Sequence, residues 1–79
     1  MKARVEITLK NGVLDPQGRA IGNALRGLGF DGVGEVRQGK LIELDVEETD
    51  PAKARERVEA MCRTLLVNPV IESYAIHVG

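Results

Sequence analysis

The sequence predicts the α+β fold class, with four strands and two helices in the order β-α-β-β-α-β. Strict alternation of apolar and polar side chains over residues 2–10 is typical of a strand with one buried face. Two Asp-Pro pairs, Asp15-Pro16 and Asp50-Pro51, each precede apolar residues at helical spacing. Three shorter apolar segments supply the remaining strands, at 33–37, 41–47 and 70–78.

The first strand and the first helix have the clearest patterns. In the strand, one face carries Ala3, Val5, Ile7 and Leu9. The helix is expected over 16–28, because Asp15 can accept a backbone N–H as N-cap and Pro16 suits the first helical position. Its apolar stripe ends at Gly29, a natural helix stop, and comprises Ala20, Ile21, Ala24, Leu25 and Leu28.

The middle of the chain predicts a hairpin followed by the second helix. Residues 33–37 and 41–47 are the two strands, and Gln38-Gly39 between them suits a tight turn. Asp50 caps the second helix, whose buried stripe comprises Ala54, Val58, Met61, Cys62 and Leu65. Asn68-Pro69 ends this helix, because a residue before proline avoids helical geometry.

The order of these elements is the ferredoxin-like arrangement, expected as a single domain over residues 1–79. Right-handed crossovers put both helices on one face of the antiparallel sheet, with the first and third strands at its centre. The last strand, 70–78, lies at an edge. The opposite sheet face is too charged to form the floor of an apolar ligand site, because it carries Arg4, Glu6, Thr8, Glu43 and Asp45.

Composition and charge argue against several classes of function. The 79 residues carry 11 basic and 12 acidic side chains, so a net charge of -1 gives no general attraction to nucleic acid or anionic membranes. The aromatic residues, Phe30 and Tyr74, lie outside the predicted central strands, which argues against RNA binding by base stacking. No apolar stretch is long enough to span a membrane. With a single cysteine and no apolar leader, we expect a cytoplasmic protein.

Catalytic and metal-binding groups are scarce. The single cysteine, Cys62, lies on the predicted buried stripe, where a thiol is a core residue rather than a nucleophile. The single histidine, His77, lies on the last strand, where we expect a surface position. The sequence has no C-x-x-C pair for a metal carrier and no second histidine for a metal site or a catalytic triad. We therefore expect no catalytic residue, no metal ligand and no cofactor site in this chain.

Glycines interrupt the first helix at positions 18, 22 and 27. An interior glycine costs about 1 kcal/mol relative to alanine, so the glycines call for an explanation. Close packing or simple tolerance within the chain is one explanation. The other is that a second chain approaches the helix at Gly22, where the flanking side chains are Arg19, Asn23 and Arg26.

Two segments are specific in combination: V-L-D-P-Q-G at 13–18 and N-P-V-I-E-S-Y at 68–74. With Ala24-Leu25, Leu28-Gly29-Phe30 and V-R-Q-G-K at 36–40, they span nearly the whole chain. Together these segments resemble the PurS family, the small subunits of phosphoribosylformylglycinamidine synthase. Two positions depart from the family pattern, since Val67 stands where alanine is expected and Ser73 where an acidic residue is common.

The resemblance implies a role in de novo purine synthesis. The family's multi-subunit enzyme converts formylglycinamide ribonucleotide, glutamine and ATP into formylglycinamidine ribonucleotide, glutamate, ADP and phosphate. A large subunit, PurL, carries out the amidation with ATP and Mg²⁺, and a glutaminase subunit, PurQ, releases ammonia. The resemblance further implies that this chain has no catalytic residues, assembles the two partners, helps ammonia to pass between them, and forms a homodimer or homotetramer.

Ten residues are expected to contact partners. The first group starts the first helix and comprises Asp15, Gln17, Gly18 and Arg19. The second lies at the predicted hairpin and comprises Arg37, Gln38 and Lys40. The third leads into the last strand and comprises Asn68, Glu72 and Tyr74. Asp15 and Asn68 also suit structural roles as a helix cap and a turn residue, and Tyr74 suits the core as well as an interface.

Two other interpretations remain open. An ACT-like regulatory domain has the same element order and binds amino acids at a dimer interface, often through a glycine-bearing loop such as Asn11-Gly12. Calorimetry with amino acids would identify it. A stand-alone enzyme is the second, and activity of the purified chain alone would identify that.

Overall fold

The computed structural model describes all residues, 1–79, and contains three strands and three helical segments. In chain order they are β1 (Lys2–Leu9), α1 (Pro16–Gly27), β2 (Gly39–Asp45), α2 (Pro51–Met61), the π-helical turn η1 (Cys62–Leu66) and β3 (Glu72–Val78). The predicted α+β class, with an antiparallel sheet and two helices, is confirmed. None of the helices combines the length and the apolar character that crossing a membrane requires.

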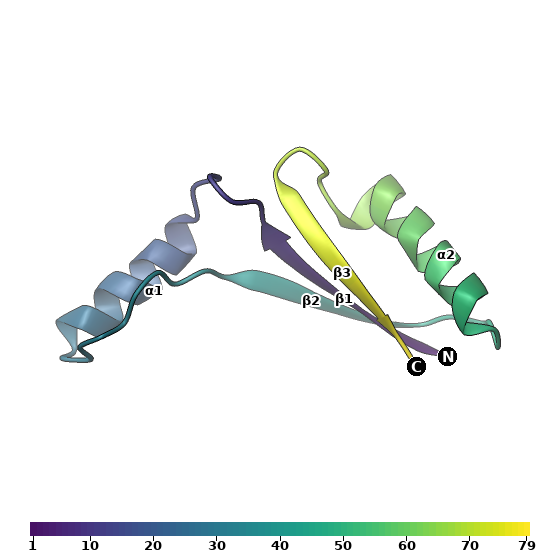
Figure 1. The fold of residues 1–79 in the computed structure, drawn as a ribbon, viewed down its shortest axis with the longest axis horizontal. Helices are drawn as coiled ribbons and strands as arrows, with labels where there is room; N and C mark the ends of the chain where they lie inside the picture. Colours follow the sequence, from purple (N-terminus) through teal and green to yellow (C-terminus); the bar gives the residue numbers. More distant parts are fainter.

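β1 is the central strand of the sheet, whose strand order is β2-β1-β3 (Figure 1). Both neighbours run antiparallel to it, so that Val5 lies opposite Ile42 of β2 and Ile76 of β3. The alternation predicted for the first strand is confirmed, because Ala3, Val5 and Ile7 share one face and are all buried. Each flanking strand has one edge that pairs with no further strand.

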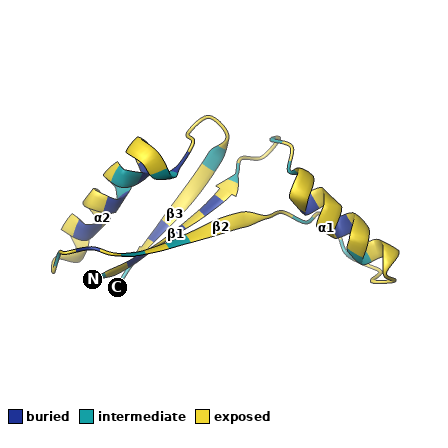
Figure 2. Cartoon of the chain, turned by 180° about the vertical axis from the view of Figure 1, so that it is seen from behind, coloured by how far each residue is buried: buried dark blue, intermediate teal, exposed yellow.

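The hydrophobic core lies between this face of the sheet and α2 (Figure 2). Val58 of α2 and Cys62 of η1 are fully buried and pack in one cluster with Val5 and Ile7 of β1. Cys62 is therefore a core residue, as predicted. We call the sheet, α2 and η1, with the loops that join them (1–10 and 39–79), the body.

α2 begins and ends through the signals that the sequence contains. The Asp50 carboxylate accepts the N–H of Ala52 at 3.0 Å, and Pro51 takes the first helical position. The helix continues into the π-helical turn, and the chain becomes extended at Val67. The predicted stop at Asn68-Pro69 therefore lies one residue beyond the point where helical geometry ends.

α1 does not belong to the body, so the prediction that both helices cover one face of the sheet is wrong. α1 spans Pro16–Gly27, close to the predicted 16–28, but it packs on no strand and not on α2. It projects away from the sheet (Figure 1). The molecule is therefore elongated, with extents of 49 × 24 × 14 Å and a radius of gyration of 16.0 Å. A compact chain of this length has a radius of gyration of about 12 Å.

The strand predicted at 33–37 and the hairpin predicted at Gln38-Gly39 are also wrong. Gly29 and Gly32 adopt positive φ angles after α1, and residues 33–38 then run back along the helix without joining the sheet (Figure 1). Gly39 lacks the positive φ of a tight turn and begins β2 opposite Thr8. The fourth strand of the ferredoxin-like arrangement is therefore absent. We call residues 33–38 the returning segment, and residues 14–38 the arm.

A candidate partner interface at the arm

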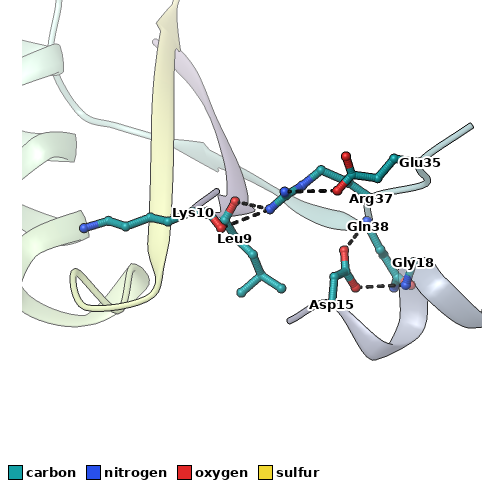
Figure 3. Close-up of polar contacts among 7 residues, drawn as sticks. All are labelled: Leu9, Lys10, Asp15, Gly18, Glu35, Arg37 and Gln38. Atoms are coloured by element: carbon teal, nitrogen blue, oxygen red, sulfur yellow. Dashed lines mark hydrogen bonds and ion pairs between the residues drawn. The ribbon is translucent and has the colours of Figure 1, made fainter. Parts of the chain in front are cut away.

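The Asp15 carboxylate joins the start of the arm to its end (Figure 3). Its Oδ1 accepts the N–H of Gly18 at 2.8 Å and caps α1, as predicted. Its Oδ2 accepts the N–H of Gln38 at 2.8 Å, where the returning segment reaches β2. These hydrogen bonds, first that from Gln38 and then that from Gly18, hold the pKa of Asp15 below its ordinary value. Both carboxylate oxygens are therefore engaged within the chain.

The Arg37 guanidinium joins the returning segment to the end of β1 (Figure 3). Nη2 donates to the backbone carbonyl oxygens of Leu9 and Lys10, the latter at 3.2 Å. Nη1 lies 3.6 Å from a carboxylate oxygen of Glu35. Arg37 therefore binds the backbone at the end of β1, at the place where the arm leaves the body. We call Asp15, Arg37 and the backbone groups that they bind the joint.

The glycines of α1 face the chain's own returning segment. A Cβ on Gly18 would overlap the carbonyl oxygen of Val36, and a Cβ on Gly22 would lie 3.3 Å from Cγ2 of Val36. Both glycines are buried, whereas a Cβ on Gly27 would meet open space. Of the two explanations offered by the sequence, close packing within the chain therefore accounts for Gly18 and Gly22, and the approach of a second chain near Gly22 stays a prediction.

Arg26 holds the far end of the arm together, a role that the sequence analysis missed. Its Nη1 donates to the carbonyl oxygens of Val33 at 3.1 Å and Gly34 at 3.2 Å, and its Nη2 donates to Oδ1 of Asn23 at 2.9 Å. Contacts between a side chain and irregular backbone seven or eight residues away leave no periodic signal in the sequence. Only the glycine-rich connection after α1 hinted that the chain turns back here.

Most of the predicted contact residues line two surface depressions beside the joint. A groove of about 260 Å³ between the arm and the sheet contains five of them: Asp15, Gln17, Gln38, Lys40 and Glu72. A wider cleft of about 580 Å³ within the arm adds three more, Gly18, Arg19 and Arg37. The first two predicted groups therefore meet at the joint, although they are separated by about twenty residues in the chain.

The third predicted group forms the turn before β3. Oε1 of Glu72 accepts the N–H of Asn68 at 2.7 Å, and Oε2 lies 3.4 Å from Nζ of Lys40 on β2. The hydrogen bond from Asn68, followed by the nearby Lys40, lowers the pKa of Glu72. Oδ1 of Asn68 accepts the N–H of Val70 at 3.1 Å, as expected of a turn residue. Tyr74 lies opposite Ile7 and is 36% exposed, between core and surface.

Exposed apolar side chains gather on the arm. Ile21 and Leu28 of the predicted stripe are 43% and 75% exposed, and the adjoining Leu14 and Phe30 are 67% and 56% exposed. The stripe was predicted from the sequence, but as part of the core that covers the sheet. A second exposed group lies at the turn between η1 and β3 and comprises Leu65, Val70 and Ile71. Apolar surface that packs on nothing in its own chain is typical of a protein–protein interface.

The single cysteine and the single histidine lie in the body. Burial raises the pKa of the Cys62 thiol, and the carboxylate of nearby Glu59 adds to this effect. His77 lies on β3, as predicted, with its side chain 46% exposed and Nε2 3.5 Å from a carboxylate oxygen of Glu6. No cluster of three or more His, Cys, Asp or Glu side chains is placed to hold a metal ion.

The fold and this surface define a class of protein. Internal hydrogen bonds occupy the polar groups of the joint, while an arm outside the core carries exposed apolar side chains. This is the arrangement of a small protein that acts by binding other protein surfaces. The family model for PurS, described as phosphoribosylformylglycinamidine (FGAM) synthase, matches residues 2–79. The chain belongs to the PurS family, as the sequence resemblance predicted.

Relatives and solved structures support this assignment over nearly the full chain. The PurS subunit of Methanocaldococcus jannaschii is 51% identical over 77 residues, which cover 98% of this chain and 93% of that protein. A crystal structure of M. jannaschii PurS, a subunit of formylglycinamide ribonucleotide amidotransferase in the purine biosynthetic pathway, superposes with a TM-score of 0.88 over 96% of this chain and 92% of that chain. The superposition therefore includes the arm as well as the body.

Two further relatives extend the comparison. The PurS subunit of Bacillus subtilis is 43% identical over 77 residues, which cover 98% of this chain and 90% of that protein. A structure of PurLQS from Thermotoga maritima contains a chain that is 38% identical, with a TM-score of 0.88 over 96% of this chain and 93% of that chain. These comparisons do not favour the ACT-like alternative.

Proposed function

We propose that this chain is the non-catalytic assembly subunit of a phosphoribosylformylglycinamidine synthase complex in de novo purine synthesis. It joins a PurL-like amidating subunit to a PurQ-like glutaminase subunit. The observation that carries the proposal is the match to the PurS family over residues 2–79, together with the likeness to a chain of T. maritima PurLQS. The exposed apolar arm supports a role based on binding, because it offers surface that the body of the chain does not cover.

Ammonia transfer is the step in which such a subunit assists. Ammonia released by a glutaminase is protonated or lost when it meets bulk water, so its path to the amidating site has to exclude water. A subunit that covers the junction between the two partners contributes to that seal through its surface alone. The groove and the exposed apolar groups on the arm and at the η1–β3 turn are the surfaces that we assign to this task.

The chemistry of the reaction belongs, in this proposal, to the partners. ATP and Mg²⁺ bind to the amidating subunit, and the nucleophile that attacks glutamine lies in the glutaminase subunit. The only thiol of this chain supports that division, because it is buried at Cys62 and its pKa is raised. We place the complex in the cytoplasm, where a free thiol persists in the reduced state.

A homodimer or homotetramer is also part of the proposal. The arm carries the apolar stripe of an amphipathic helix that packs on no strand and on no other helix, and the outer edge of β2 is unpaired. A second copy can cover both features by a two-fold arrangement. Analytical ultracentrifugation over a range of concentrations tests this directly. A chain that remains monomeric up to high micromolar concentration would contradict self-association.

Reconstitution tests the assembly role. The chain is mixed with the amidating and glutaminase subunits, and product formation is measured with glutamine and, separately, with ammonium as the nitrogen source. We expect glutamine-dependent activity to require this chain and ammonium-dependent activity of the amidating subunit to proceed without it. The chain alone is expected to be inactive with either nitrogen source.

The outcomes separate coupling from catalysis. Equal glutamine-dependent activity with and without the chain would contradict the assembly role. A requirement for the chain in the ammonium-dependent reaction would show that it contributes to the amidation itself. Calorimetry with amino acids is the control for the regulatory alternative, and we expect no heat of binding.

A further inference from the structure

The arm is attached to the body at one place only. Within one copy of the chain, α1 packs on no element of the body, so its covalent connections and the joint are all that fix its direction there. A 12-residue helix without tertiary support is marginal in water. The order of the arm therefore depends on contacts that tie it to the returning segment and tie that segment to β1.

The register of the sheet shows what the joint replaces. β1 and β2 pair antiparallel up to Thr8 opposite Gly39. The next pairs in this register would be Leu9 opposite Gln38 and Lys10 opposite Arg37, but the backbone of the returning segment leaves the sheet there. The Arg37 side chain reaches back across the gap and donates to the carbonyl oxygens of Leu9 and Lys10. The Gln38 N–H, freed in the same way, is taken up by Asp15.

Each of these contacts lies on a different part of the arm. Arg37 ties the returning segment to the body, and Asp15 ties the first turn of α1 to the returning segment. Hydrogen bonds with one charged partner are stronger than neutral ones, and both contacts are of this kind. Together they connect the body, the returning segment and the helix in series.

We propose that Arg37 and Asp15 are positioning residues, which hold the arm at a fixed angle to the body so that its apolar stripe is presented already ordered to a second copy of the chain, the form that then joins the partner subunits. This inference rests on the proposed assembly function for its consequence, but its structural part concerns the free chain alone. A preordered arm binds more tightly than a mobile one, because its conformational entropy is lost during folding and not during binding. Arg37 thus acts through the arm and not through direct contact with a partner's acid.

The experiment uses the full chain with four variants, of which Asp15→Ala removes the cap that joins α1 to the returning segment. Arg37→Ala removes the bridge to β1, and Arg37→Lys keeps a cation that can still donate to the same carbonyls. Arg19→Ala is the matched control for the exchange measurement alone, because Arg19 lies on the same arm and its side chain makes none of the contacts of Arg37, but it is itself a predicted partner contact. Amide hydrogen exchange of the free chain is measured first, and the concentration that half-saturates glutamine-dependent activity in the reconstituted complex is measured second.

We expect Arg37→Ala to speed amide exchange in α1 by about tenfold, the equivalent of one charge-assisted hydrogen bond, and to leave β1 and α2 protected. The half-saturating concentration should rise by a similar factor, and Arg37→Lys should restore most of both values. Arg19→Ala should exchange as the unmodified chain does. Asp15→Ala should speed exchange in α1 in the same way as Arg37→Ala.

The two readouts keep the inference separate from the proposed function. Unchanged exchange in α1 of Arg37→Ala would overturn the positioning role. Weaker assembly with unchanged exchange would overturn it as well, and would identify Arg37 as a direct contact. If the unmodified chain fails to support glutamine-dependent activity, the assembly function fails, while exchange in the free chain still decides whether the joint orders the arm.

Discussion

The body and the arm are two parts of one chain that differ in how far they bury their apolar side chains. All nine buried apolar side chains lie in the body, between the sheet and α2. The only buried residues of the arm are the glycines Gly18 and Gly22, which sit against the returning segment. The body is therefore held by burial of side chains, whereas the arm is held by hydrogen bonds to backbone groups.

The difference teaches that an amphipathic helix does not specify its own partner. α1 and α2 both begin at Asp-Pro and both carry apolar stripes. The stripe of α2 meets the sheet and forms a core, whereas the stripe of α1 meets no strand and no other helix. A small chain that leaves one stripe uncovered gains a surface for association at the expense of its own stability.

The largest expected loss of stability follows a substitution in the core of the body. Ile7→Ala removes a side chain that is 1% exposed in the core, and it should lower the free energy of unfolding by about 2–5 kcal/mol. Ile21→Ala makes the same change in the arm, at a side chain that is 43% exposed, and should cost less than about 0.5 kcal/mol in the monomer. Urea denaturation at low protein concentration measures both. Similar losses for the two variants would show that the arm has a core of its own.

The next effect concerns the packing of the arm. A Cβ on Gly18 would overlap the carbonyl oxygen of Val36, so Gly18→Ala should push the returning segment from α1 and destabilise the arm by about 1–3 kcal/mol. Gly27→Ala is the matched control, because its Cβ enters open space and alanine favours the helix by up to about 1 kcal/mol. Amide exchange in α1 reports both changes. Equal protection in the two variants would argue against close packing at Gly18.

A smaller effect is expected when the pH is lowered, because acid should destabilise the arm. The pKa of Asp15 is lowered on folding, so the charged carboxylate stabilises the arm. This contribution is fully present above the ordinary pKa of 3.8 and is lost as the pH falls through the lower folded value. Exchange or chemical shifts in α1, followed from about pH 6 down to about pH 3, should show the arm loosening in acid.

Two neutral variants assign this pH dependence. Asp15→Asn should abolish it in α1, whereas Glu72→Gln should abolish the parallel change at the turn before β3, where the pKa of Glu72 is also lowered. An acid transition in α1 that survives in Asp15→Asn would show that another group controls the arm.

The smallest effect lies on the surface of the body. Arg63 and Glu59 form an ion pair at 3.6 Å with side chains 64% and 47% exposed. Arg63→Ala should change the free energy of unfolding by about 0.3–0.5 kcal/mol, because solvent screens such pairs. The difference should vanish in 1 M salt, measured by the same urea denaturation. A loss comparable to that of Ile7→Ala would mean that charge, and not burial, holds the body together.

Much of the fold could be predicted because its signals are local. The alternation over 2–10, the caps at Asp15 and Asp50 and the buried position of Cys62 each depend on neighbours within a few residues. The same holds for the turn at Asn68. The family could be recognised for a similar reason, since the segments that indicate it are short runs of specific residues. The candidate site was predicted less completely, as a set of residues without their roles.

The tertiary structure alone decided what those residues do. From the sequence alone, the two helices, the strands of the body, their apolar faces and the family could be predicted, because periodicity and capping act over short distances. The sequence did not determine that residues 33–38 follow α1 instead of pairing with β2, since a segment this short, with apolar residues only at Val33 and Val36, suits both outcomes. That choice rests on Gly18, Gly22 and the contacts of Asp15 and Arg37 across more than twenty residues. Contacts at that separation arise from the path of the backbone in space, and no local pattern encodes them.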